Sequence, residues 1–270
     1  IPPFELIEAV RKGVVDLAGS PGSYYSAQVP EAGAMYLSQM TPEQERQNGA
    51  YALFNKVIAQ KANAYYLGRY NTTYKFNFYS KVKIEKMTDF KGLKMRVSPV
   101  YRAFLKELDG VPIVMPHSEI YTALERGVVQ GMGGTNFDIM DQGWHEQIKF
   151  IVDPPFYGSD TGIVVNLDTW NKLTPETQAV FMEAGEATSA YSITLDAEAT
   201  ETGVATIEAA GGSIAEMSAD EFQTYYAGLF ASMANAGYGR AKEKGIEADM
   251  VTLLTKAADI TGQTWAPPAN

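Results

Sequence analysis

The stretch KGLKMRV at residues 91–97 predicts a tight turn followed by a short strand that carries an arginine near its end. Gly92 suits the turn because it lacks a Cβ atom, and the residues after it alternate between apolar and charged, as in a half-buried strand. Ser98-Pro99 ends the strand, because proline cannot donate to a sheet and keeps the preceding residue extended. Arg96 is therefore the last charged side chain before the carboxyl end of a strand.

The position of Arg96 is typical of a ligand contact. Ligands of open α/β sheets bind just outside the carboxyl ends of the strands. A guanidinium group there holds a carboxylate through two parallel charge-assisted hydrogen bonds, which lysine does not reproduce. The alternative is a surface arginine on the polar face of a strand, and the pattern alone leaves both interpretations open.

Two further strand ends are expected at the same edge of the sheet. Residues 111–115 predict a strand that leads to His117, and residues 128–131 predict one that runs into a glycine-rich loop with Thr135 and Asn136. Helical patterns separate these strands, which favours a mostly parallel sheet whose strand ends face one crevice. His117 is either a ligand contact or a helix cap.

The beginning of the chain shows a similar crossing from strand to loop. Residues 14–19 predict a short strand, and the small-residue loop after it carries Ser20, Tyr24 and Tyr25. Loops at strand ends often supply ligand contacts, so these three residues are candidates. The alternative is a surface turn with packed tyrosines.

Helix patterns and chain length indicate two domains. Residues 41–44 (TPEQ) predict the start of a helix that runs to about residue 63, and residues 174–210 predict a helix too long for one ordinary domain. A chain of 270 residues accommodates two domains. Because no linker rich in proline or glycine separates them, the chain is expected to cross between the domains several times.

Composition excludes several classes of function. The net charge of −10 disfavours nucleic acid as a partner, and the absence of cysteine excludes disulfides and thiolate chemistry. No apolar run is long enough to span a membrane. The two histidines lack metal-site spacing and no nucleophile-elbow motif occurs, so no metal, cofactor or catalytic residue is expected.

Residues 89–97, 116–131 and 166–174, in this order, resemble the substrate-binding proteins of TRAP (tripartite ATP-independent periplasmic) transporters, the dicarboxylate-type or DctP family. Residues 8–16 and 30–31 also match its first domain. The resemblance implies an α/β, two-lobed periplasmic-binding-protein clamshell with several interdomain crossings and a long bracing helix. Lobe I is expected at 1–73 and 163–201, and lobe II at 74–162 and 202–270. Relatives begin with a strand, a helix and a strand, so this N-terminal segment is expected to be missing here.

The resemblance also implies a set of ligand contacts. In relatives such as the sialic-acid-binding members, the arginine that matches Arg96 pairs with the carboxylate of the ligand. His117 stands where relatives usually have an aromatic residue, and a second basic residue of some relatives falls near Phe76. The remaining implied contacts are Thr135 or Asn136 after the glycine-rich strand, Ser20, Tyr24 and Tyr25 in the first lobe, and Tyr157 near another cleft-facing strand.

The function that the resemblance implies is transport. The chain is expected to be a periplasmic, monomeric binding protein, not an enzyme, that captures a small organic acid between two lobes and delivers it to a TRAP membrane permease. One alternative is a sensory module that binds an organic acid. A remoter one is a hydrolase or lyase that uses His117 with Asp160 or a nearby serine.

Overall fold

Two sheets organise the residues that the computed structural model describes, which are 1–37, 40–70, 74–159 and 161–268. The chain divides into two units. Unit 1 comprises Ile1–Thr72, Asp160–Ile193 and Ala234–Asn270, and unit 2 comprises Thr73–Ser159 and Thr194–Met233. The chain therefore changes unit after residues 72, 159, 193 and 233, and the last two changes fall inside continuous helices.

The sheet of unit 2 has the strand order β5-β4-β6-β3-β7-β9. β4 pairs in parallel with β5 and β6, whereas β3 runs antiparallel to β6 and β7. The parallel sheet predicted from the sequence is thus present in β5, β4 and β6, whose carboxyl ends lie at one edge. The strands are β3 (Lys75–Ser80), β4 (Lys94–Val97), β5 (Val111–Val114), β6 (Gly131–Thr135), β7 (Phe150–Gly158) and β9 (Ser213–Glu216).

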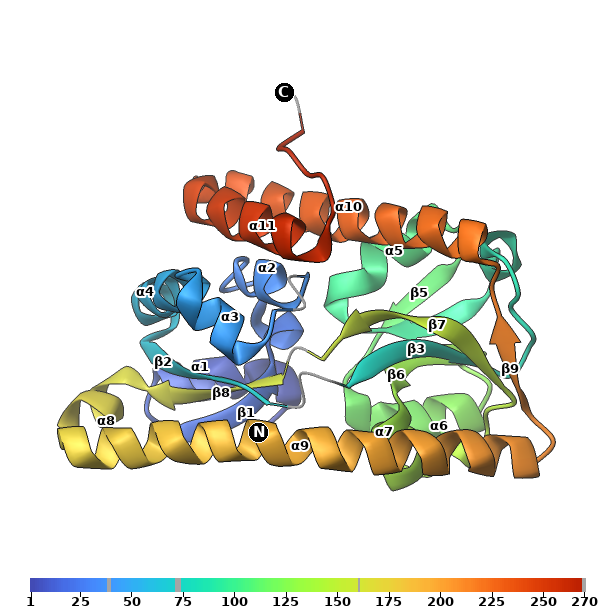
Figure 1. Ribbon diagram of the computed structural model, residues 1–270, viewed down its shortest axis with the longest axis horizontal. Helices are drawn as coiled ribbons and strands as arrows, with labels where there is room; N and C mark the ends of the chain where they lie inside the picture. Colours follow the sequence, from blue (N-terminus) through green and yellow to red (C-terminus); the bar gives the residue numbers. More distant parts are fainter. Residues whose placement is uncertain (38–39, 71–73, 160, 269–270) are drawn as a thin grey trace. The chain divides into compact units, whose positions relative to one another are not determined.

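Helices cover both faces of this sheet. α5 lies on one face, and α6 and α7 lie on the other (Figure 1). The helices of unit 2 are η3 (Met87–Phe90), η4 (Pro99–Tyr101), α5 (Arg102–Glu107), η5 (His117–Glu119), α6 (Ile120–Glu125), α7 (Asn136–Asp141) and η6 (Trp144–Glu146). α9 (Pro175–Ala209) and α10 (Ala219–Glu243) belong to both units.

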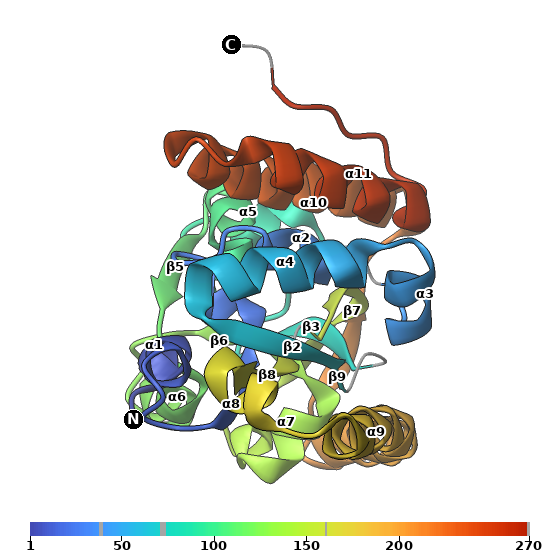
Figure 2. The ribbon, with the colours of Figure 1, turned by 90° about the vertical axis from the view of Figure 1, so that its left-hand side faces the viewer.

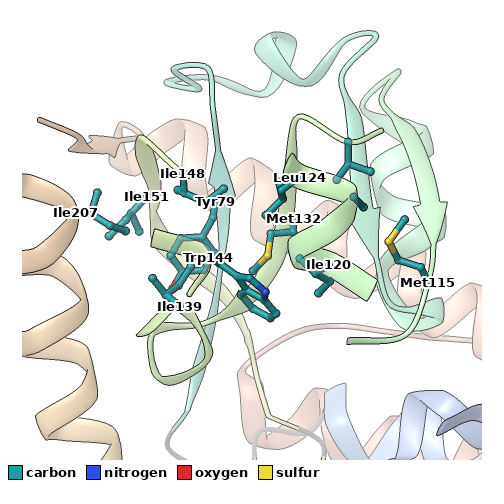
Figure 3. Close-up of a cluster of buried hydrophobic side chains, with 12 residues drawn as sticks. Tyr79, Met115, Ile120, Leu124, Met132, Ile139, Trp144, Ile148, Ile151 and Ile207 are labelled. Atoms are coloured by element: carbon teal, nitrogen blue, oxygen red, sulfur yellow. The ribbon is translucent and has the colours of Figure 1, made fainter. Parts of the chain in front are cut away.

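One apolar cluster joins the α6 and α7 side of the sheet to the second half of α9 (Figure 3). Trp144, Met132 and Ile139 lie at its centre and are fully buried, and Ile207 brings α9 into it. Burial of such side chains contributes roughly 1.5–3 kcal/mol each. This packing fixes the start of α7 beside the end of β6.

Unit 1 contains a three-stranded antiparallel sheet with the order β1-β8-β2. α4 packs beside β2 (Figure 2), and α11 packs on α2 and α4. Because β1 and β2 both run antiparallel to β8, their carboxyl ends share one edge. The elements are η1 (Pro3–Glu5), α1 (Leu6–Arg11), β1 (Leu17–Pro21), η2 (Gly22–Tyr25), α2 (Ala32–Leu37), α3 (Pro42–Gln47), α4 (Ala50–Ala62), β2 (Ala64–Arg69), β8 (Thr161–Asn166), α8 (Leu167–Lys172) and α11 (Glu247–Thr261).

The predicted helix from residue 41 to about residue 63 is two helices. The capping box at its start is confirmed, because the Thr41 side chain accepts from the Gln44 backbone N–H at 3.2 Å and the Gln44 side-chain oxygen accepts from the Thr41 backbone N–H at 2.9 Å. The helix nevertheless ends at Gln47, because Gly49 adopts a φ of 81°, which breaks the helical path before α4 begins.

The glycine run after residue 130 is a strand and not the loop that the sequence predicted. β6 covers Gly131–Thr135 and pairs with both β3 and β4, whereas the predicted strand at 128–131 lies almost wholly before it. A Cβ atom on Gly131 would lie 2.4 Å from the backbone oxygen of Tyr79, so this strand position excludes a side chain. The glycines reflect close packing here and not loop flexibility.

The long helix is confirmed as α9, and the units differ from the predicted lobes mainly near the C-terminus. Residues 234–270 belong to unit 1, whereas the sequence placed 202–270 in lobe II. α11 packs on helices of unit 1, and the Lys256 amine donates to the Asn48 carbonyl at 2.6 Å. No helix in the described ranges is both long and apolar enough to cross a membrane.

Candidate functional site

Arg96 lies at the joint carboxyl end of three parallel strands. It occupies β4, opposite residues of β5 and β6, and is 2% exposed. Its Nε donates to the Met115 carbonyl at 3.1 Å, and its Nη1 donates to the Gly133 carbonyl at 3.3 Å. The guanidinium therefore connects β6 with the residue that follows β5, and β5 and β6 are the two neighbours of β4 in the sheet. These acceptors orient the group without adding negative charge.

Tyr101 supports this arginine and was not predicted from the sequence. Its hydroxyl donates to the Gly133 carbonyl at 3.1 Å and lies 3.5 Å from Nη1 of Arg96. Its ring packs edge-on against Phe156, with the ring centroids 5.1 Å apart. A Cβ atom on Gly133 would lie 2.6 Å from the Tyr101 hydroxyl oxygen, so this position needs glycine. In the sequence, the only sign that another residue packs closely against this strand is its series of glycines, Gly131, Gly133 and Gly134.

Gly133→Ala is expected to displace the Tyr101 hydroxyl and loosen Arg96, with a loss of roughly 1–3 kcal/mol in the free energy of unfolding. Denaturant unfolding measures this change. Gly185→Ala on α9 is the matched control, since a methyl group there meets open space among the described residues, and alanine should stabilise the helix by about 0.5–1 kcal/mol. Equal effects of both substitutions would contradict the packing role of Gly133.

His117 begins η5, which Met115 and Pro116 separate from β5, and pairs with a carboxylate of α7. Its Nε2 lies 3.3 Å from Oδ2 of Asp138, and its ring packs on Trp144 with the centroids 4.6 Å apart. The residue in the N-cap position of η5 is Pro116, so the structure does not give His117 the capping role that the sequence left open. That His117 contacts a ligand stays a prediction. Asp138 and Trp144 were not predicted as part of it.

Asp138 is held from two sides. Its carboxylate accepts from the Thr135 hydroxyl at 2.6 Å and pairs with His117. Burial raises the pKa of Asp138, but the hydrogen bonds from His117 and Thr135 outweigh it and leave the pKa below its ordinary value. The carboxylate is therefore charged at neutral pH and acts as an acceptor.

The contribution of Asp138 to stability is expected to disappear in acid. Because its pKa is lower in the folded than in the unfolded chain, the stabilisation is complete above about pH 4 and is lost as the pH falls through the folded pKa. The free energy of unfolding of Asp138→Asn should therefore lie below that of the unmodified chain at pH 7, and the difference should shrink as the pH falls below about 4. Denaturant unfolding at pH 7 and along an acid series tests this, and a difference independent of pH would contradict it.

Thr135 and Asn136, both predicted contacts, hold the start of α7. The Thr135 hydroxyl accepts from the Asp138 N–H at 3.2 Å as the N-cap of α7. The Asn136 amide accepts from the Tyr79 hydroxyl and donates to the Thr200 hydroxyl of α9 at 3.2 Å. These bonds give both residues a structural role.

Phe76 lies on β3, next to β6 and β7. It stands opposite Thr135 in one pairing and opposite Tyr157 in the other. Its half-buried ring packs edge-on against Phe156, with the centroids 6.3 Å apart. The side chain of Tyr157 and the whole of Asp160 lie outside the described residues.

The candidates of unit 1 gather where β1 runs into η2. The Ser20 hydroxyl is buried and donates to the Pro21 carbonyl at 3.3 Å. Tyr24 packs on Phe4 at 4.5 Å between ring centroids, and Tyr25 is buried and lines a small pocket. Ser20, Tyr24 and Tyr25 thus lie in unit 1, and the other candidates lie in unit 2.

A buried ion pair of unit 1 was also missed. Nη2 of Arg69, at the end of β2, lies 2.5 Å from Oε1 of Glu45 on α3, and both side chains are almost fully buried. Arg69 also donates to the Met40 carbonyl. Burial raises the pKa of Glu45, and the charge of Arg69 offsets this only in part. In sequence Glu45 looks like an ordinary charge on a helix face, because its partner is 24 residues away (69 − 45).

Comparison with known proteins decides the family. The family model DctP, described as bacterial extracellular solute-binding protein, family 7, matches residues 2–235. The chain belongs to this family. Among the described residues, no group of three or more His, Cys, Asp or Glu side chains is placed to hold a metal ion.

Curated proteins related to this DctP-family chain are matched over part of their length. An uncharacterised protein of Haemophilus influenzae is 36% identical over 109 residues, which are 40% of this chain and 33% of that protein. A monocarboxylate 2-oxoacid-binding periplasmic protein of Nostoc sp. is 26% identical over 196 residues, which are 68% of this chain and 53% of that protein. The match thus spans a third to about half of these two relatives.

The fold is that of TRAP periplasmic solute-binding proteins, as the sequence predicted. One such protein, from Desulfovibrio salexigens and solved with bound orotic acid, matches with a TM-score of 0.83 at 19% identity. The match covers 96% of this chain and 85% of that one. The family and fold of this DctP-family chain are those of binding proteins that serve transport.

Proposed function

We propose that the chain is the solute-binding component of a TRAP transporter, which captures a small organic acid in the periplasm and delivers it to a membrane permease. The observation that carries the proposal is Arg96, a buried guanidinium held by two carbonyls where three parallel strands end. A positively charged group fixed in this way is suited to a carboxylate. The similar proteins named above bind 2-oxoacids and orotic acid, both of which carry a carboxylate.

The proposed binding step involves no covalent chemistry. The carboxylate of the ligand pairs with Arg96, His117 contacts the adjoining part of the ligand, and Phe76 and Tyr157 contact its body. Thr135 and Asn136 act there mainly by holding α7 in place. The protein is proposed to act as a monomer and not as an enzyme.

The two units are proposed to act as the two lobes of the family fold. Unit 1 contributes Ser20, Tyr24 and Tyr25. A ligand that contacts both units binds the closed state better than the open state and so shifts the population toward the closed state. The permease then distinguishes the loaded protein by this state.

A screen of organic acids tests the proposal. Thermal unfolding of the protein is followed with mono- and dicarboxylates, sugar acids and their neutral amides, and mass spectrometry identifies any acid carried through purification. A ligand at a hundred times its Kd should stabilise the protein by about 2.7 kcal/mol, which is a clear rise in Tm. Stabilisation by amides as strong as by the acids, or by no acid at all, would reject the proposal.

A further inference from the structure

The Tyr101 hydroxyl lies between the guanidinium of Arg96 and the neighbouring strand. Tyr101 ends η4 and comes five residues after Arg96, so the end of β4 and the short helix after it supply both groups. Nη1 of Arg96 donates to the Tyr101 hydroxyl at 3.5 Å, and this hydroxyl donates to the Gly133 carbonyl at 3.1 Å. The same carbonyl accepts from Nη1 at 3.3 Å. The hydroxyl is therefore an acceptor toward the arginine and a donor toward β6.

Aromatic packing fixes the position of the Tyr101 hydroxyl. The side chain is fully buried, and its ring packs edge-on against Phe156 and Phe78, with the centroids 5.1 and 5.9 Å away. These two phenylalanines stack on each other at 4.3 Å between centroids. On the side of β6, the hydroxyl oxygen occupies space that a side chain at Gly133 would fill. Contacts that do not involve Arg96 thus hold the hydroxyl in place.

The fixed hydroxyl restrains the plane of the guanidinium. The carbonyls of Met115 and Gly133 accept from Nε and Nη1 of Arg96, but a planar group held at two atoms can still rotate about the line that joins them. The Tyr101 oxygen is a third acceptor and opposes this rotation. Bidentate binding of a carboxylate needs the two planar groups aligned to within about 10–20°. Alignment before the ligand arrives removes part of the entropic cost of binding.

We propose that Tyr101 is a positioning residue, which raises the affinity for the acid by holding Arg96 in the orientation that a carboxylate requires. The inference rests on the proposed function, because the carboxylate must be bound by Arg96. Tyr101 acts through the arginine and does not have to contact the ligand. Without the hydroxyl, binding of the acid also has to order the guanidinium, so the affinity should be about tenfold lower.

Calorimetry of Tyr101→Phe with the best acid from the screen tests the proposal. Phenylalanine keeps the ring that packs on Phe156, and the Gly133 carbonyl keeps its bond from Arg96, so the variant should fold. Its Kd should be about tenfold higher than that of the unmodified chain.

Tyr51→Phe is the matched control. It also removes a tyrosine hydroxyl that donates to a strand carbonyl, which is that of Leu67 on β2 at 3.4 Å. This hydroxyl belongs to unit 1 and has no part in the arrangement around Arg96 described above. The control should leave the Kd unchanged within about twofold, although it removes the same chemical group.

A double-variant cycle with Arg96→Lys determines whether Tyr101 acts through the arginine. In the Arg96→Lys background, Tyr101→Phe should change the Kd by less than about twofold, because lysine has no guanidinium plane to restrain. A general structural effect of the tyrosine would weaken binding by the same factor in both backgrounds. The cycle therefore separates positioning of Arg96 from a loss of packing.

Two results would overturn the inference. One is a folded Tyr101→Phe protein that binds the acid as tightly as the unmodified chain, and the other is an equal loss in the two backgrounds. If Arg96→Lys still weakens binding in these cases, the proposed function stands without the inference. If Tyr101→Phe does not fold, Gly133→Ala takes its place in the cycle, because its methyl group displaces the same hydroxyl. If no acid binds, or binding does not depend on Arg96, both the inference and the proposed function fail.

Discussion

Arg96→Lys is expected to weaken binding of the carboxylate ligand at least tenfold while the protein remains folded. Lysine retains the positive charge but has no planar fork, so it cannot bridge the carbonyls of Met115 and Gly133 and also hold a carboxylate in bidentate fashion. Arg96→Met removes the charge as well and should weaken binding about a hundredfold or more. Calorimetry with the best acid from the screen measures both changes.

The matched control for this prediction is Arg102→Lys. Arg102 begins α5, six residues after Arg96, and is exposed. Its substitution should leave the Kd unchanged within about twofold, since lysine keeps the positive charge and the side chain is exposed. Unchanged affinity in a folded Arg96→Lys protein would remove this arginine from the site.

Breaking the Arg69–Glu45 pair is expected to have the largest effect on stability. The charged atoms lie 2.5 Å apart and both side chains are almost fully buried. Arg69→Met or Glu45→Leu alone leaves an uncompensated charge in the interior and should lower the free energy of unfolding by roughly 3–5 kcal/mol. The double variant removes both charges, so its loss should be much smaller than the sum of the two single losses. Denaturant unfolding of the unmodified chain, the two single variants and the double variant gives the coupling free energy between Arg69 and Glu45.

An exposed ion pair supplies the comparison. Lys83 and Glu85 lie 2.7 Å apart with about half of each side chain exposed. Removing either charge should alter stability by less than about 1 kcal/mol, because solvent screens the pair. If the single substitutions at Arg69 and Glu45 lower the free energy of unfolding no more than these, burial does not make the Arg69–Glu45 pair important for stability.

Local patterns located the end of β4, and the position of Arg96 near it, well. Alternation, a glycine turn and a proline stop are all properties of neighbouring residues, so the end of β4 could be located before any tertiary contact was known. The first and last helix positions of α9 follow from a proline start and a glycine end in the same way. The position of Arg96 in the fold can be predicted from these signals together with the parallel order of β5, β4 and β6.

The errors have a common physical cause, which is that distant packing overrides local preference. β6 looked like a loop because its glycines were read as flexible, whereas Tyr101 and Tyr79 leave no room for side chains there. Tyr101 and Asp138 became part of the site only through contacts with residues on other elements. The residues around Glu45 in the sequence give no indication that its side chain is buried.

The division of unit 1 into three chain segments bears on how the protein folds as it is made. All of unit 2 lies between residues 73 and 233, so its chain is finished while unit 1 still lacks residues 234–270. α11, which packs on α2 and α4, belongs to that final segment. α2 and α4 therefore complete their core only after α11 has been synthesised, which is later than all of unit 2. Such pairing of sequence-distant segments is the slow part of folding and the part most exposed to aggregation.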